Sequence, residues 1–310
     1  MTAAAGSRRR RIVRGVLGLA VVVALVVSVS GQWDQVRGRL DDVSAATLAG
    51  SLVLTVVGLG FSMLSWRAVL AGLGSPLPVA AAARVFFLSQ LGKYLPGSVW
   101  PVVAQMELGR DHDVPRSRMA AAGVVAMGFG VAAAVLLGAA VVPFGVADAG
   151  SVRWLALAVP AVLLLLHPAL LSRLLGTTLR LLRRAPLERP LDAATVVRGL
   201  GYAVLTWVCT GLHVWLVARD LGGGGDRLLP LAVGGFALAW AAGFLVVIAP
   251  AGAGVREGAL VVALSGSLGR PAAVALALIS RLVLTAADVV VAVVVVVRRR
   301  VGGSAAAQEV

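Results

Sequence analysis

Long apolar stretches separated by short polar loops form the main pattern of this chain. Apolar runs cover about 12–30, 45–66, 79–106, 118–143, 152–171, 198–218, 229–249 and 255–297. A helix needs roughly 20 apolar residues to cross the hydrocarbon core of a membrane, and most of these runs reach that length. The last run is interrupted at 269–271, which leaves a short piece, 255–268, before a long valine-rich piece. The pattern predicts an all-α polytopic integral membrane protein.

The composition agrees with a membrane protein. Hydrophobic residues make up 59% of the chain and charged residues only 14%, against roughly a quarter in soluble domains. The formal net charge of +14 would suit a nucleic-acid partner, but the arginines gather in short loops between the apolar runs. Because that distribution sets the orientation of membrane proteins, we expect membrane lipids as partners and no nucleic acid.

Arginine counts in the loops predict the topology. The tail 1–11, the loops 107–118 and 172–198 and the tail 298–310 are rich in arginine, which places both termini in the cytoplasm. A single transmembrane domain, 12–297, lies between the tails. These assignments agree only if 79–106 enters and leaves on one side as a re-entrant hairpin, and if 255–268 is a short crossing. We therefore expect about eight crossings and one re-entrant element.

A helix break interrupts the run at 79–106. The segment GKYLPG, 92–97, holds Lys93, the only lysine among the 28 lysine and arginine residues of the chain, followed by Tyr94, Pro96 and Gly97. A Pro-Gly pair leaves backbone groups unbonded, and lipid cannot satisfy them. Such backbone is tolerated where protein or a water-filled cavity surrounds it, so we expect this break to line a cavity.

A second break, IAPAGAGVREG, covers 248–258. Pro250, Gly252 and Gly254 precede a helix that opens with Arg256 and Glu257. Pro96 and Pro250 lie about half a chain apart. Paired Pro/Gly interruptions in the two halves of a membrane protein indicate a transporter's binding site, and they are consistent with two structurally related halves.

Ionisable residues near the breaks supply the candidate chemistry. The N-terminus of a helix attracts anions, and arginine offers a fork of donors that suits phosphate. Arg281 and Asp288, in the last run, share a helix face but lie two turns apart, too far to bond each other directly. We predict that an anionic headgroup binds Lys93, Tyr94, Arg256 and Arg281, and that Glu107, Glu257 and Asp288 balance these charges or carry protons.

Each candidate also has a purely structural interpretation. Lys93 and Tyr94 would extend from the span to the lipid headgroups, Glu257 would cap a helix, and Arg281 and Asp288 would form interhelical ion pairs. The sequence has no nucleotide-binding loop, no nucleophile elbow and no metal-ligand spacing. We therefore expect no catalytic residue, no cofactor, no metal and no enzymatic activity.

Both breaks lie in motifs with a family resemblance. The segments SQLGKYLPGSVWPVVAQMELGRDHDVPR and VVIAPAGAGVREGALVVAL resemble the membrane domain of the lysylphosphatidylglycerol synthase and flippase-like family. The resemblance implies a bacterial plasma-membrane protein with about eight spans and re-entrant elements, which moves or presents lipids. Members that synthesise aminoacylated lipids carry a soluble transferase domain. Only ten residues follow Arg300, so we expect neither that domain nor that synthesis here.

Three functions fit these observations. The leading hypothesis is a flippase or translocator of an anionic lipid or lipid-linked intermediate. The alternative is a non-transporting scaffold, on which the basic loop 172–198 docks a glycosyltransferase or lipid-modifying enzyme. A membrane-embedded transferase acting on lipid-linked sugars would need a catalytic carboxylate, and the loop aspartates form no recognisable motif for one.

Overall fold

A computed structural model describes residues 38, 40–95, 99–145, 154–181, 189–246, 252 and 254–306. These residues form helices joined by turns, and no strand occurs among them. The helices are α2 (Ala45–Gly72), α3 (Val79–Gln90), η1 (Leu91–Tyr94), α4 (Trp100–Leu108), η2 (Gly109–His112), α5 (Arg116–Gly145), α6 (Trp154–Leu165), α7 (Pro168–Leu181), α8 (Ala193–Asp220), α9 (Leu228–Leu245), α10 (Val255–Leu268) and α11 (Arg270–Ala306).

The fold is that of a multi-pass membrane protein. Within the described ranges, α2, α5, α8, α9 and α11 are long and apolar enough to cross a membrane. Helices α6 and α7 reach that length only together, and they are bent by 66° where Pro168 starts α7. The prediction of eight crossings is not confirmed. The first apolar run, 12–30, lies outside the described residues, and α10 has only 14 residues.

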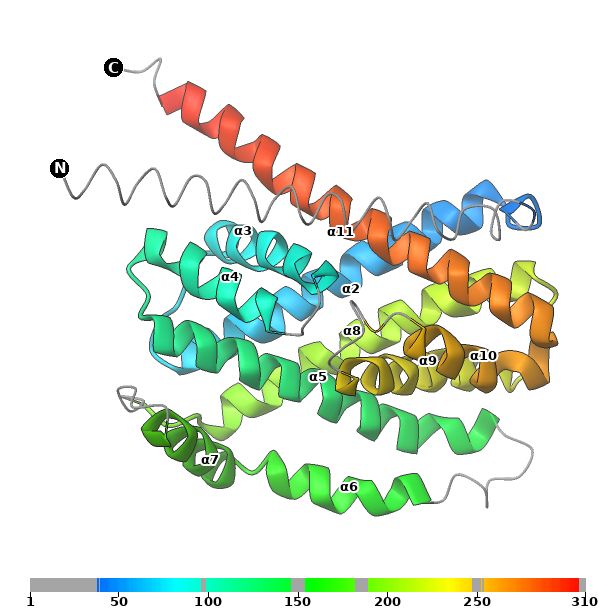
Figure 1. The fold of residues 1–310 in the computed structure, drawn as a ribbon, viewed down its shortest axis with the longest axis horizontal. Coiled ribbons are helices and arrows are strands. Elements are labelled where there is room, and N and C mark those ends of the chain that lie inside the picture. The colour runs from blue at the N-terminus through cyan, green and yellow to red at the C-terminus, as the bar shows by residue number, and fades with distance from the viewer. Residues whose placement is uncertain are drawn as a thin grey trace.

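Helices α3 and α4 pack against each other as a hairpin with η1 at its tip (Figure 1). Both outer ends of this hairpin lie at one end of the molecule, where Arg118, at the start of α5, donates to the backbone oxygen of Gly74 and to Ser75 Oγ. Gly72 and Thr195 are also in contact there. We call this end, formed by 72–78, 109–118 and 189–195, the basic end.

Helices α9 and α10 form a second hairpin, which starts from the opposite end. Gly243 lies against Arg256, Gly235 against Ala263 and Gly223 against Leu268. The end of α9 therefore contacts the start of α10, and the end of α10 lies near the start of α9. The two helices are antiparallel, so α10 returns along α9 to the place where α9 begins. There the Ser44 amide donates to Asp220 Oδ2 at 2.9 Å. We call this end, formed by 41–44, 220–227 and 268–270, the acidic end. The segment 255–268, predicted to cross separately, thus pairs with α9.

The two hairpins meet inside the bundle. Helix α3 has 12 residues and α10 has 14, which rise roughly 18 and 21 Å, against roughly 42 Å for the 28 residues of α2. The two tips therefore lie between the basic end and the acidic end of the bundle. Long helices surround them: α11 contacts α2, α3, α8 and α10, while α5 packs against α2, α4, α8 and α9.

Glycine allows the long helices to approach closely. A Cβ added at Gly58 of α2 would lie 3.3 Å from the Thr206 backbone oxygen of α8. The approach is closer between α8 and α9, where a Cβ at Gly211 would lie 2.4 Å from Val233 Cα. Helices in lipid associate through such small-residue contacts, because hydrophobic association gives little stabilisation there.

Gly211→Ala tests this packing. The added methyl group meets backbone, which a rotamer change cannot relieve, so we expect a loss of about 1–3 kcal/mol of unfolding free energy. Gly201→Ala is the matched control on the same helix, because nothing lies within 4 Å of its added Cβ. It should be neutral or stabilising by up to about 1 kcal/mol. Denaturant unfolding in detergent micelles, followed by tryptophan fluorescence, measures both, and equal stabilities would contradict this account of the α8–α9 interface.

Candidate functional site

The tips of the two hairpins border one cavity of about 200 Å³. Lys93, Tyr94 and Leu95 reach it from the first hairpin, and Gly252 and Arg256 reach it from the second. Residues from α2, α3, α4, α5, α8, α9 and α11 complete the wall. The sequence predicted a cavity at the first break, and the structure places both breaks at the same cavity.

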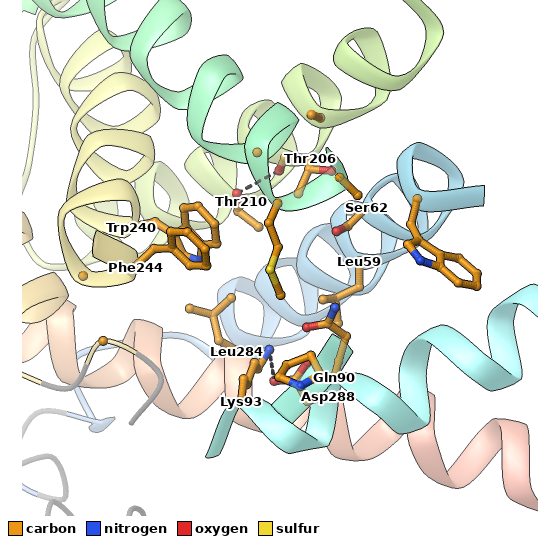
Figure 2. A pocket seen from close by; sticks show the side chains of 18 of the residues that line it. Leu59, Ser62, Gln90, Lys93, Thr206, Thr210, Trp240, Phe244, Leu284 and Asp288 are labelled. Carbon is orange, nitrogen blue, oxygen red and sulfur yellow. Dashed lines mark hydrogen bonds and ion pairs between the residues drawn. The ribbon is translucent and has the colours of Figure 1, made fainter. Parts of the chain in front are cut away.

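A charged cluster joins the first tip to α11. Lys93 Nζ lies 2.6 Å from Asp288 Oδ2, and the Tyr94 hydroxyl donates to the same oxygen at 2.6 Å. Figure 2 shows Lys93 and Asp288 facing each other at one side of the cavity. The Asp288 side chain is only 3% exposed. Lys93, whose own side chain is 31% exposed, therefore pairs with a buried carboxylate of α11.

A second cluster joins the other tip to α11. Glu257 Oε1 accepts from Arg256 at 2.8 Å and from Arg281 at 3.1 Å, while Glu257 Oε2 accepts from the Gly254 amide at 2.7 Å. All three charged side chains are at most 12% exposed. Glu257 thus caps α10 and also neutralises part of the charge of two arginines.

Glycine permits the backbone path into this cluster. Gly252 and Gly254 adopt φ values of 71° and 83°, which residues with a side chain rarely adopt. A Cβ at Gly252 would also lie 3.1 Å from Gly243 Cα of α9. The glycines therefore allow the chain to turn tightly against α9 and to start α10 with Arg256 beside the cavity.

The predicted site residues fall into three groups. Lys93, Tyr94, Gly252, Arg256, Arg281 and Asp288 line the cavity. Glu257 contacts both arginines, and Gly254 donates to Glu257, but neither lines the cavity. Glu107 lies elsewhere, in ion pairs with Arg116 at 3.0 Å and Arg110 at 3.5 Å. Its nearness in sequence to the first break suggested a shared site, but α4 carries it back toward the basic end. Pro96, Gly97 and Pro250 lie outside the described residues. A lipid-binding role for any of them stays a prediction.

An aromatic and hydroxyl wall was not predicted. Trp240 lies 4.6 Å from Trp207 and stacks on Phe244 at 5.1 Å, measured between ring centroids. Thr206 and Thr210 line the cavity on α8 (Figure 2), and their hydroxyls donate to backbone oxygens one turn earlier. Because these residues are apolar or bond their own helix, they look like ordinary parts of a span. The spacing of four between Thr206 and Thr210 was the one available signal.

The arrangement suits the polar part of an amphiphilic ligand. A charged side chain at the centre of a membrane helix costs roughly 2.5–3.5 kcal/mol on insertion scales, so the five charges here need one another or a ligand. The aromatic side chains provide an apolar wall next to these charges. The cavity can therefore hold a charged headgroup beside apolar atoms.

Opposed helical hairpins that meet at a charged cavity define a polytopic helical membrane domain. The chain belongs to the family described as the lysylphosphatidylglycerol synthase TM region, which matches residues 15–292. This match confirms the predicted family. No curated protein matches the chain.

Asp288→Ala tests the first cluster. Removing the carboxylate leaves the Lys93 ammonium and the Tyr94 hydroxyl without their shared acceptor, so we expect unfolding to become easier by about 3 kcal/mol. The double variant Lys93→Met with Asp288→Ala should lose less, because it leaves no unpaired charge. A double-mutant cycle from denaturant unfolding in micelles measures the difference. Strictly additive losses would show that Lys93 and Asp288 do not stabilise each other.

Proposed function

We propose that this protein translocates an anionic lipid or lipid-linked intermediate across the membrane, with the headgroup bound in the cavity between the hairpin tips. The observation that carries the proposal is the meeting of two hairpins, from opposite ends, at a cavity lined by Lys93, Arg256 and Arg281. A site at intermediate depth, between elements that start from opposite ends, suits a molecule that passes from one leaflet to the other.

The chemistry of the headgroup follows from the donors. Arginine binds phosphate or carboxylate through paired hydrogen bonds, and lysine adds a compact charge. Asp288 and Glu257 hold these cations in place while the cavity is empty, so the donors are already positioned when an anion arrives. The stacked Trp240 and Phe244 provide an apolar surface for the part of the lipid next to the headgroup.

Binding also acts on the hairpins themselves. An anion that replaces Asp288 on Lys93 loosens the link between the first tip and α11. An anion that replaces Glu257 on the arginines does the same at the second tip. Because each hairpin lies between the cavity and one end of the molecule, loosening one tip opens the path to that end.

A scaffold function remains the second candidate, and helix α7 supports it. This helix bends away from α6 and exposes Arg173 and Arg180. It lies at the basic end, where the Leu191 amide donates to Ser172 Oγ of α7. An exposed basic helix next to the bilayer offers a surface to anionic lipid or to an acidic partner enzyme. In that case, the protein would present lipid to a glycosyltransferase or lipid-modifying enzyme and would move none by itself.

Purified protein in liposomes separates the two functions. Labelled phosphatidylglycerol in the inner leaflet is protected from a membrane-impermeant quencher until it is translocated. We expect Lys93→Ala and Arg256→Ala to slow translocation about tenfold or more, because each removes a charged hydrogen-bond donor to the headgroup. Arg227→Ala, an exposed arginine at the acidic end, is the matched control and should leave the rate unchanged.

The outcomes are distinct. Unchanged rates for both cavity variants would remove the cavity as the translocation site. A wild-type protein that moves no lipid, although it is folded in the liposomes, would favour the scaffold function.

A further inference from the structure

Two buried polar atoms at the cavity have no hydrogen-bond partner in the part of the chain that the structure describes. They are Nε1 of Trp66, on α2, and Oε1 of Gln105, on α4. Both residues line the cavity, and they are 0% and 1% exposed. A buried polar atom without a partner costs free energy, and native proteins contain few of them. At a cavity, such an atom can gain its partner from a ligand.

Several polar side chains of the same cavity already have partners. The Ser65 hydroxyl, next to Trp66 in the chain, donates to the Gly199 backbone oxygen at 2.7 Å. The Thr206 and Thr210 hydroxyls donate within α8. The indole N–H of Trp66 therefore differs from these neighbouring hydroxyls, because the protein itself does not supply its acceptor.

The absence of a side chain at Gly123 makes room for the Gln105 amide. A Cβ added at Gly123 of α5 would lie 2.6 Å from Gln105 Oε1, which is too close for two non-bonded atoms. Gly123 itself lines the cavity. The amide oxygen of Gln105 thus lies beside the cavity, at the contact between α4 and α5.

Helix α2 places the Trp66 indole at the same cavity. Leu59, Ser62 and Trp66 recur at intervals of three and four residues, so they share one helix face, and all three line the cavity. The Trp66 ring packs against Phe86 of α3, with 5.8 Å between the ring centroids. Figure 2 shows Leu59 and Ser62 across the cavity from Trp240. This face of α2 is therefore separate from the aromatic wall.

The two unpaired atoms require opposite hydrogen-bond roles from a ligand. The indole N–H can only donate, and the amide oxygen can only accept. An ionised phosphate or carboxylate accepts but does not donate, whereas an ammonium donates but does not accept. A hydroxyl group does both. Hydroxyl groups can therefore satisfy both atoms.

We infer that Trp66 and Gln105 form an uncharged subsite of the cavity, which binds hydroxyl groups of the ligand, such as those of a polyol or sugar headgroup. The inference rests on the proposed function, because it extends the same headgroup site. Lys93 and Arg256 hold the acidic group, and the subsite holds the neutral, hydroxylated part of the same headgroup. An analogue without hydroxyls leaves both atoms unpaired and binds more weakly.

Two lipids of equal charge test the subsite. Dihexanoyl phosphatidylglycerol and dihexanoyl phosphatidylpropanol are both phosphodiesters with a three-carbon headgroup, and they differ only in the two hydroxyl groups. Each is added over a range of concentrations to the purified protein in neutral detergent, and the rise in melting temperature measures the affinity. We expect the wild-type protein to bind phosphatidylglycerol about tenfold or more tightly than phosphatidylpropanol.

Single substitutions remove one polar atom at a time. Trp66→Phe removes the N–H and keeps an aromatic ring, and Gln105→Met keeps an unbranched side chain without the amide oxygen. Each should reduce the preference for phosphatidylglycerol about threefold or more, because the hydroxyl groups lose one of their partners. Trp215→Phe, on α8, also removes an indole N–H, but Trp215 does not line this cavity, so the preference should stay unchanged.

Equal wild-type affinities for the two lipids would overturn the inference, as would an unchanged preference in a folded variant of Trp66 or Gln105. The two substitutions lie on different helices, so loss of fold in one leaves the other, and the wild-type comparison, to decide. The liposome assay separates this inference from the proposed function. A preference for the hydroxylated lipid without translocation would refute only the function, and translocation without that preference would refute only the inference.

Discussion

Charged side chains that meet inside a membrane domain are the constraint on which this structure depends. Helix α11 contributes Arg281 to one hairpin tip and Asp288 to the other, so one continuous helix holds both breaks in place. Each break interrupts the helical hydrogen-bond ladder where lipid offers no replacement. The same contacts satisfy the charges and position the interrupted backbone, because each tip is anchored by its own ionisable side chain.

Close helix packing makes these contacts attainable. Glycine positions bring α2, α8 and α9 together without large intervening side chains, and the positive φ values of Gly252 and Gly254 allow a tight approach to α9. Lipid offers the charged groups no other partners, so a small separation of the helices would leave them unpaired. The pairing of the charged side chains therefore depends on close helix packing more strictly here than in a water-soluble bundle.

The sequence revealed the unusual residues more readily than it revealed how the helices are arranged in space. Lys93, Arg281 and Asp288 stood out because ionisable residues are scarce in apolar runs, and the two Pro/Gly breaks stood out because proline and glycine interrupt helices. Hydropathy measures length and composition but not direction. It could not show that α10 returns along α9, and the predicted short crossing at 255–268 stays a prediction. Glu107 was grouped with the first break because the two are close in sequence, whereas α4 separates them in space.

The spacing of the two anchoring residues on α11 has a consequence for any bound lipid. Seven residues of helix rise roughly 10 Å, which is about twice the width of a phosphate group. One phosphate therefore cannot occupy both clusters at the same moment. If a lipid headgroup is translocated through this cavity, as proposed, it binds the two clusters one after the other, and α11 carries a residue of each cluster.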